Sequence, residues 1–457
     1  MPKPRSEEHY LASLVPPSVQ ATAGLGMGRR GFLKGAAGAG AALTLPALLA
    51  ACGGGDDETT GGGGGGGGEK ASGTVSFGSN EAGGDVPQLR RDAIAAAYQK
   101  SSGLKLKVNA VDHNTFQANI NKYLQGNADD VFSWFAGYRM QFFAERGLIG
   151  DVSDVWPIDG IGDAFKKAAT GADGKQYFVP DSNYPWVVLY RKSLWKERGY
   201  TPPTTLDEMV TLAKKMQSDG LTPFAFADKQ GWPAMGTFDI LNMRVNGYDF
   251  HVNLMAGEEA WDSAEVKTVF DTWRELLPYH QPDALGRDWE EASQSVVANK
   301  SGMYYLGLFM FEQFPEAERD DVDFFNFPEV DSNVGADAID APIDGYCMSA
   351  DPANEAGAKD FLAWLGSPEA AAAANDAGYP LIWANSKADL TGLQPIQQKA
   401  GTFIAEQTSI AQFLDRDTRP DFASTVMIPS IQEFIKNPND VDGLTKKIEE
   451  QKKSIFV

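Results

Sequence analysis

The chain has 457 residues and a net charge of -22, with 62 acidic against 40 basic side chains. This charge disfavours a broad basic surface, so neither nucleic acid nor anionic lipid is expected as a partner of the folded part. The length exceeds what one hydrophobic core usually organises, which predicts two lobes.

The first 51 residues have the pattern of an export signal. Arg29 and Arg30 form a twin-arginine pair, and a Gly/Ala-rich apolar run follows them. The run ends in Leu49-Ala50-Ala51-Cys52, which resembles a bacterial lipobox with a lipidated cysteine. Because Gly and Ala bury little surface and a membrane span needs about 20 apolar residues, we expect a cleaved signal; an uncleaved anchor is the alternative. The mature protein is therefore expected outside the cytoplasm, held on the cell membrane through Cys52.

Residues 52–72 form the next segment, which includes an uninterrupted run of eight glycines at 61–68. Such a composition cannot bury a core and predicts a flexible tether. With Cys52 lipidated, Cys347 is the one remaining cysteine, so no intramolecular disulfide is expected. Cys347 is interpreted as a small buried apolar residue.

The folded part begins near residue 73 with alternating strand and helix signals. A short strand at 75–77 precedes a helix that starts at Asp85 and Pro87, with Leu89, Ala93 and Ala97 on its apolar side. Alternating apolar residues over 104–110 predict a half-buried strand, and 130–135 predicts a buried one, followed by a helix over 138–146. This order indicates mainly parallel sheets flanked by helices.

The second half continues with capped helices and further strands. A capping box at Thr205 and an N-terminus at 262–265 begin two helices, and later helices are predicted to start at 351–352 and 367–369. Strands are predicted at 302–305 and 322–325, and a last helix over 442–453. No internal repeat is visible.

From residue 73 to its end, the chain resembles the family 1 extracellular solute-binding proteins, the sugar receptors of ABC importers. Six segments carry the resemblance in the order expected for the family. They lie at 130–137, 143–149, 187–195, 202–209, 302–307 and 358–365.

The resemblance implies a two-lobed α/β periplasmic-binding-protein fold with a ligand cleft at the hinge. Carried over in order, the first lobe comprises 73–183 and 336–388, and the second lobe 184–335 and 389–457. Crossing segments are expected near 181–185, 328–333 and 384–388. Ligand capture would proceed by hinge closure of a monomer, which the importer's permease subunits then recognise.

A sugar has apolar C–H faces and hydroxyl groups, which suit aromatic rings and Asp, Asn, Glu or Arg side chains. In an open α/β sheet such residues gather on loops at the carboxyl ends of strands. Family members also place a polar C-terminal loop against the ligand, which adds the segment at 415–420. The candidate ligand-binding residues are Asn80, Glu81, Asp112, His113, Trp134, Tyr138, Tyr184, Trp186, Trp232, Phe309, Asp344, Tyr346, Asp415 and Arg416.

Several of these residues have plainer interpretations. Trp134 and Trp186 are equally compatible with a structural core, Asp415 and Arg416 with a local surface ion pair, and His113 with a loop residue outside the site.

The function has alternatives as well. A non-sugar solute such as a polyamine would suit acidic residues among aromatic ones, and a surface protein without an importer is a further class. The chain has no Gly-x-Ser-x-Gly elbow, no phosphate-binding loop and no paired His/Cys metal spacing, so an enzyme, a cofactor or a metal is not expected. A carboxylate pair of a glycan-acting enzyme stays open at this stage.

Overall fold

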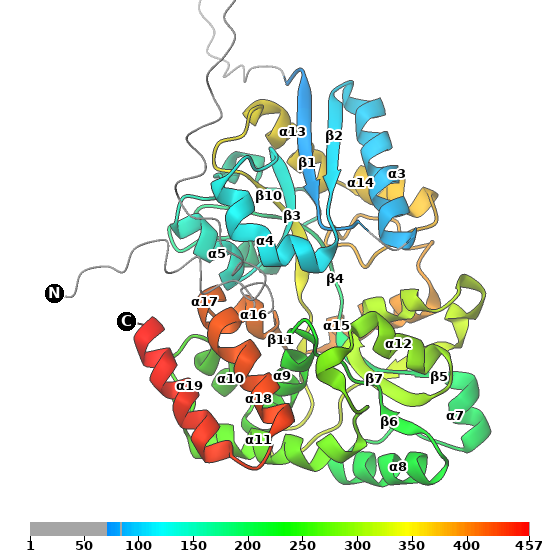
Figure 1. The fold of residues 1–457 in the computed structure, drawn as a ribbon. Helices are drawn as coiled ribbons and strands as arrows, with labels where there is room; N and C mark the ends of the chain where they lie inside the picture. Colours follow the sequence, from blue (N-terminus) through cyan, green and yellow to red (C-terminus); the bar gives the residue numbers. More distant parts are fainter. Residues whose placement is uncertain (1–70, 83–84, 457) are drawn as a thin grey trace, which may run out of the picture. The chain divides into compact units, whose positions relative to one another are not determined.

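The structure, a computed structural model, describes residues 71–82 and 85–456. The predicted export signal, Cys52 and most of the predicted tether lie outside these residues. From Ala71 onward the chain forms one compact unit. Within this unit, Figure 1 shows two sheets, one in the upper half and one in the lower half, with helices around each of them.

The upper sheet has five strands in the order β2-β1-β3-β10-β4. β1 pairs in parallel with β2 and β3, whereas β10 pairs antiparallel with β3 and β4. β10 thus runs against the other four strands, so the sheet is mixed, where a mainly parallel one was predicted. The strands are β1 (Thr74–Ser79), β2 (Lys105–Ala110), β3 (Val131–Phe135), β4 (Val179–Asn183) and β10 (Ile343–Met348).

The lower sheet has four strands in the order β6-β7-β5-β8. β6 and β7 are parallel, and β5 pairs antiparallel with β7 and β8, so this sheet also contains one reversed strand. The strands are β5 (Trp186–Arg191), β6 (Thr222–Phe224), β7 (Ser301–Gly307) and β8 (Val322–Phe325).

A third, two-stranded parallel sheet joins β9 (Ala338–Asp340) to β11 (Ser409–Ala411). β9 directly precedes β10 of the upper sheet, and β11 directly precedes the segment at 413–416, which is described with the cleft below. The chain also passes between the sheets at 184–185, where β4 ends and β5 begins, and Ser182 forms an isolated bridge with Trp383 there. The lobe boundaries themselves remain predictions.

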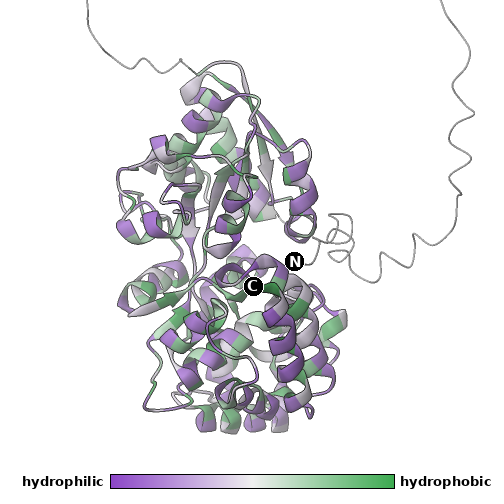
Figure 2. Cartoon of the chain, turned by 90° about the vertical axis from the view of Figure 1, so that its left-hand side faces the viewer, coloured by the Kyte–Doolittle hydropathy of each residue, from purple (hydrophilic) through white to green (hydrophobic). Residues whose placement is uncertain are grey.

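Helices cover both sheets, and purple and green residues alternate along most of them in Figure 2, as expected for helices with one apolar face. α9 is the exception, since Pro233 through Arg244 are all buried. Around the upper sheet lie α3 (Asp85–Ser102), α4 (His113–Gln125), α5 (Tyr138–Glu145), α6 (Asp163–Ala168), α13 (Glu355–Leu365) and α14 (Pro368–Asp376). The others are α7 (Lys192–Arg198), α8 (Leu206–Ser218), α9 (Pro233–Asn246), α10 (Tyr248–Met255), α11 (Ala264–Leu276), α12 (Trp289–Val297), α15 (Pro395–Glu406), α16 (Leu414–Asp417), α17 (Pro420–Phe422), α18 (Ile428–Lys436) and α19 (Val441–Ile455).

Separate apolar cores hold each sheet to its helices. In the upper sheet, Val131 belongs to one buried cluster and its neighbour Phe132 to another, because successive side chains of a strand point to opposite faces. One large cluster fills the lower half and includes Trp261 and Trp273. Cys347 is free and buried in the upper sheet, which confirms its predicted role.

Two helix predictions need correction. In α3, Leu89 is 45% exposed, whereas Ile94 and Tyr98 are buried, so the apolar face differs from the predicted one. The reason is that Arg90 and Arg91 occupy buried positions, where they are neutralised by acidic partners. α13 starts at Glu355 rather than at 351–352, because the Asn354 side chain accepts the Gly357 N–H and caps it.

Most other predicted boundaries agree with the structure. The Thr205 side chain caps α8 by accepting the Glu208 N–H at 3.3 Å. The Glu208 carboxylate, however, accepts from the Thr204 N–H at 2.8 Å instead of completing the predicted box with Thr205. Ser263 caps α11 as expected, and α19 spans the predicted last helix.

Candidate binding cleft

One cleft of about 1100 Å³ is lined by residues from both the upper and the lower elements. Its upper wall is formed by the loop after β1, the start of α4, the end of β3 and the start of β10. Its lower wall is formed by the N-terminus of α9 and by η4, the 3-10 helix at Leu308–Gln313. The 184–185 crossing and the C-terminal segment at 413–416 complete the lining.

The structure brings thirteen of the fourteen candidate residues together in this cleft. Tyr138 is the exception, since it is not among the lining residues, and its neighbour Arg139 lines the cleft instead. Successive helical residues differ in direction by about 100°, so only one of this pair can face the ligand space. Contact with a ligand remains a prediction for all of them. The thirteen are Asn80, Glu81, Asp112, His113, Trp134, Tyr184, Trp186, Trp232, Phe309, Asp344, Tyr346, Asp415 and Arg416.

Aromatic rings form the lower wall. Trp232 lies 6.1 Å from Trp186, 6.3 Å from Phe309 and 6.4 Å from Trp289 between ring centroids. Tyr184 meets Phe309 edge to face at 5.3 Å. Such a group offers several apolar surfaces on which a pyranose ring can stack.

Trp186 and Trp134 are core residues whose edges reach the cleft. Trp186 is 3% exposed and Trp134 is 1% exposed, and both line the cleft. Trp186 lies against the backbone of α9, where a Cβ at Gly236 would come within 2.5 Å of its ring. The core and site interpretations thus apply to the same side chains.

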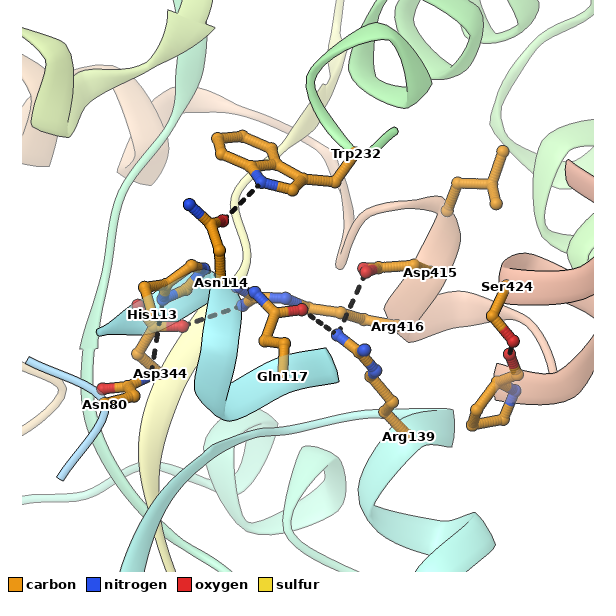
Figure 3. Close-up of polar contacts among 12 residues, drawn as sticks. Asn80, His113, Asn114, Gln117, Arg139, Trp232, Asp344, Asp415, Arg416 and Ser424 are labelled. Carbon is orange, nitrogen blue, oxygen red and sulfur yellow. Dashed lines mark hydrogen bonds and ion pairs between the residues drawn. The ribbon is translucent and has the colours of Figure 1, made fainter. Parts of the chain in front are cut away.

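Arg416 is held by a set of partners on the upper side. Its Nη1 donates to Asp344 Oδ1 at 2.9 Å (Figure 3). Its Nη2 donates to the Tyr184 hydroxyl at 3.3 Å, and its guanidinium lies 4.0 Å from the Phe135 ring centroid. Burial raises the pKa of Asp344, and the Arg416 charge opposes that rise. Gly137 packs closely against the backbone of Arg416. Its φ is +83°, and a Cβ at this position would lie 2.8 Å from the Arg416 carbonyl oxygen, so both the backbone conformation and the close contact favour glycine.

Arg139 forms a second buried ion pair, which crosses from α5 to α16. Its Nη1 donates to Asp415 Oδ2 at 3.0 Å and to Gln117 Oε1 at 2.7 Å (Figure 3). The guanidinium lies 5.0 Å from the Trp134 ring centroid. Asp415 and Arg416 therefore form ion pairs with Arg139 and Asp344 rather than with each other, and the interpretation as a local surface ion pair is wrong.

His113 begins α4, and Asp112 caps this helix by accepting the Thr115 N–H at 3.0 Å. One ring nitrogen, Nδ1, lies 3.5 Å from Asn80 Nδ2, and the other contacts the Gln117 amide (Figure 3). Burial, together with the nearby charges of Arg416 and Arg139, lowers the pKa of His113 to about 4. The imidazole is therefore neutral at pH 7, and each nitrogen serves as donor or acceptor rather than as a charge.

Two polar contacts link the upper and lower walls directly. Arg90 of α3 pairs with Glu81 at 3.3 Å and with Glu312 of η4 at 3.4 Å. Trp232 Nε1 donates to Asn114 Oδ1 at 3.3 Å (Figure 3). Near Arg90, burial and the charge of Glu81 raise the pKa of Asp181 to about 7.

Sequence reasoning missed several lining residues, namely Arg90, Asn114, Gln117, Arg139, Trp289 and Glu312. A helix starting at His113 was not predicted, although Asp112 two residues before Asn114 is a usual N-cap. With that helix in place, Gln117 follows from His113 at i+4. Arg90 and Glu312 are 222 residues apart in the chain, so no local pattern could join them.

The family model of the bacterial extracellular solute-binding proteins matches residues 85–372. The chain belongs to this family. The predicted resemblance and fold are thereby confirmed, and the chain is a solute-binding protein by descent.

Relatives of this solute-binding protein include an uncharacterised ABC transporter extracellular-binding protein of Pyrococcus horikoshii, 26% identical over 302 residues. These residues are 63% of this chain and 66% of that protein. A probable sugar-binding periplasmic protein of Rhizobium meliloti is 26% identical over 203 residues, which are 42% of this chain and 48% of that protein. The chain thus matches between about half and just under two thirds of the length of these curated relatives.

Solved structures give longer matches. The bacterial solute receptor AcbH is 42% identical with a TM-score of 0.82, covering 84% of this chain and 100% of AcbH. AcbH is described as having an exclusive preference for β-D-galactopyranose. A chitin oligosaccharide binding protein has a TM-score of 0.74 at 21% identity, with 84% of this chain and 99% of that chain covered, which concerns the fold alone.

Among the helices at 71–82 and 85–456, none combines the length and the hydropathy that crossing a bilayer would require.

Proposed function

We propose that this protein is an extracytoplasmic receptor that captures a monosaccharide of the β-D-galactopyranose type and delivers it to an ABC importer. The observation that carries the proposal is the 42% identity to AcbH, which extends over the whole length of that receptor. A cleft with one aromatic wall and one polar wall supports a pyranose ligand, because the ring has apolar faces and an edge of hydroxyl groups.

The pairing of charges favours a sugar over a polyamine. Three carboxylates of the cleft are bound to guanidinium groups, namely Asp344 to Arg416, Asp415 to Arg139, and Glu312 to Arg90. Paired in this way, they offer hydrogen-bond donors and acceptors side by side, as hydroxyl groups require. A polyamine would need unpaired negative charge instead.

Capture proceeds by closure of two lobes, made of about 73–183 with 336–388 and 184–335 with 389–457. Arg90 with Glu312 and Trp232 with Asn114 are two of the contacts between these lobes, and we expect opening of the cleft to break them. A ligand that touches both walls binds the closed form more tightly and shifts the equilibrium toward it. The closed receptor then presents its surface to the permease subunits.

The location follows from the N-terminal pattern. The twin-arginine signal exports the chain, Cys52 carries the lipid, and residues 52–72 tether a monomeric receptor to the membrane. The protein binds its ligand without converting it, so it is not an enzyme and needs no cofactor for capture.

The test is titration calorimetry on the chain from residue 71, which forms one compact unit. D-galactose should bind at micromolar concentration or below, while D-glucose, which differs in the configuration at C4, should bind at least tenfold more weakly. A buried hydrogen-bonding group that loses its hydroxyl partner explains such selectivity.

Three other outcomes would overturn parts of the proposal. Binding of an oligosaccharide without binding of galactose would replace the ligand class within sugars. Binding of spermidine with no response to any sugar would favour the polyamine alternative, and release of products from a test glycan would favour an enzyme.

A further inference from the structure

Three side chains with metal-binding chemistry meet below the cleft. Asp239 lies in α9, His251 in α10 and Asp340 at the end of β9, and one ligand atom of each lies within 4.8 Å of the others. All three residues are fully buried. Figure 1 shows α9 and α10 close to β11, the partner strand of β9.

These side chains are largely without partners. In the part of the chain that the structure describes, both carboxylate oxygens of Asp340, Oδ1 of Asp239 and Nε2 of His251 have no hydrogen-bond partner. The other oxygen of Asp239 accepts the Leu414 N–H at 2.7 Å. A buried carboxylate without a partner is strongly unfavourable, so this group of atoms must either take up protons or bind a cation.

The neighbouring charges do not supply that cation. The Arg244 charge lowers the pKa of Asp340, but its guanidinium donates to the carbonyl groups of Phe327 and Ala338 and to Asn326 Oδ1. Asp417 adds further negative charge close to Asp340.

Protonation is the alternative means of neutralising the cluster. Burial raises the pKa of Asp239 and of Asp340, and each of them is affected by a neighbouring carboxylate. One shared proton would join one pair of oxygens, but it would leave the second oxygen of Asp340 and Nε2 of His251 without partners.

We propose that Asp239, His251 and Asp340 bind one divalent transition-metal ion, for which Zn²⁺ is the best match. An imidazole with two carboxylates is a nitrogen and oxygen ligand set typical of zinc, with the fourth position left for water. Zinc bonds of about 2.1 Å in a tetrahedron place ligand atoms about 3.4 Å apart, so atoms that now lie within 4.8 Å of one another would approach by at most about 1.4 Å. Ca²⁺ and Mg²⁺ fit less well because they prefer oxygen ligands alone.

A second residue is placed to orient the imidazole. The Asn242 side-chain amide lies 3.1 Å from His251 Nδ1. In the structure the amide nitrogen faces Nδ1, and the amide oxygen accepts from Asn246 Nδ2 at 2.8 Å. A turn of both amides would place the Asn242 oxygen against Nδ1, so that it accepts the Nδ1 proton and leaves the Nε2 lone pair for the metal, as partners of metal-bound histidines commonly do.

The position of the site gives the ion a structural role. Asp239 also holds the backbone of Leu414, which directly precedes the cleft residues Asp415 and Arg416. Asp340 lies four residues before Asp344, the partner of Arg416. An ion here therefore ties α9, α10 and the β9 segment together directly behind one wall of the cleft.

The test is metal uptake by the full-length chain, purified in detergent without a histidine tag and dialysed first against a chelator. After incubation with Zn²⁺ and removal of excess metal, elemental analysis should find one zinc per chain. Asp340→Asn and His251→Gln should each weaken zinc binding at least tenfold. The matched controls Asp228→Asn and His280→Gln, which change another buried carboxylate and another histidine with an unpartnered nitrogen, should retain it.

Thermal unfolding separates the metal from the shared proton. With Zn²⁺ present, wild type should gain melting temperature by mass action and Asp340→Asn should not. A wild-type chain that takes up no zinc, cobalt or manganese, or variants that bind zinc as wild type does, would overturn the proposal.

X-ray absorption of the cobalt-loaded or zinc-loaded wild-type chain decides the matter if the variants do not fold. A shell with imidazole nitrogen and carboxylate oxygen supports the site, whereas sulfur or oxygen alone overturns it. Since no sugar is used, the result is independent of the proposed ligand.

Discussion

At Trp232 the fold leaves a large aromatic ring only partly buried on the wall of the cleft. The ring is surrounded by Trp186, Trp289 and Phe309, and its Nε1 reaches across to Asn114. From its position at the start of α9, after a Gly-containing loop, we expect it to be a stacking surface for the ligand rather than a core residue.

Trp232→Ala should weaken sugar binding at least tenfold, which corresponds to about 1.4 kcal/mol, because a stacking surface is lost. The melting temperature of the sugar-free protein should change little. Calorimetry and thermal unfolding measure the two effects, and Trp232→Phe, which retains a ring, is the control. A large loss of stability without sugar would instead identify Trp232 as part of the core.

Single residues also mark where sequence reasoning failed. Tyr138 was a candidate and Arg139 was not, yet Arg139 makes the ion pair with Asp415 in the cleft. An aromatic residue after a strand is a familiar sign of a sugar site, whereas a buried arginine is recognised only when its distant acidic partner is known.

At the scale of elements, α3 and η4 are joined across the cleft by Arg90 and Glu312. The Arg90 side chain is 8% exposed and that of Glu312 is 13% exposed, so the pair is shielded from solvent. Glu81, on the same side as Arg90, can neutralise the guanidinium alone. We therefore expect loss of the ion pair with Glu312 to affect the open–closed equilibrium more than the free energy of unfolding of either lobe.

Glu312→Gln should lower sugar affinity by about three- to tenfold, or about 0.7–1.4 kcal/mol, because the closed form loses a contact that the open form lacks. Calorimetry gives the affinity, and small-angle X-ray scattering of the sugar-free protein should show a larger radius of gyration. Glu316→Gln, which changes an exposed carboxylate on the same rim, should have no effect. Equal affinity and shape in the two variants would show that the Arg90 contact does not govern closure.

Helix prediction succeeded where local chemistry determines the boundary and failed where packing does. The cap at Ser263 and the strand at 322–325 follow from neighbouring residues, and both were predicted. The face of α3 depends instead on packing, since Arg90 lies buried between Glu81 and Glu312, which come from other segments of the chain.

For the whole molecule, buried Asp228 links stability to pH. Oδ1 of Asp228 accepts the Ala234 N–H at 3.0 Å, and burial raises the pKa of this carboxyl to about 8 against 3.8 for a free aspartate. Between about pH 4 and pH 8 the folded protein keeps this proton and the unfolded chain has lost it. The free energy of unfolding therefore falls as pH rises through this window, by up to about 1.4 kcal/mol per pH unit.

Asp228→Asn removes this proton linkage. Relative to wild type, the variant should gain stability progressively from pH 5 to pH 8, because it no longer contains a carboxyl group that must be kept protonated. Urea unfolding at several pH values measures the difference. Asp389→Asn, at an exposed position, is the control and should show no such trend. A constant difference between the Asp228 variant and wild type would mean that Asp228 is ionised in the fold.

The sequence by itself determined the family, much of the order of strands and helices, and thirteen of the residues that line the cleft. These follow from local patterns: caps, alternation of apolar residues, and polar or aromatic residues after strands. Only the tertiary structure decided which charges pair, as in Arg90 with Glu312 and Arg139 with Asp415, and that Asp239, His251 and Asp340 meet. These ion pairs and this cluster join residues that are between twelve and several hundred positions apart in the chain. The energy of each interaction depends on how deeply the groups are buried and how far apart they lie, and both are fixed only when the chain folds.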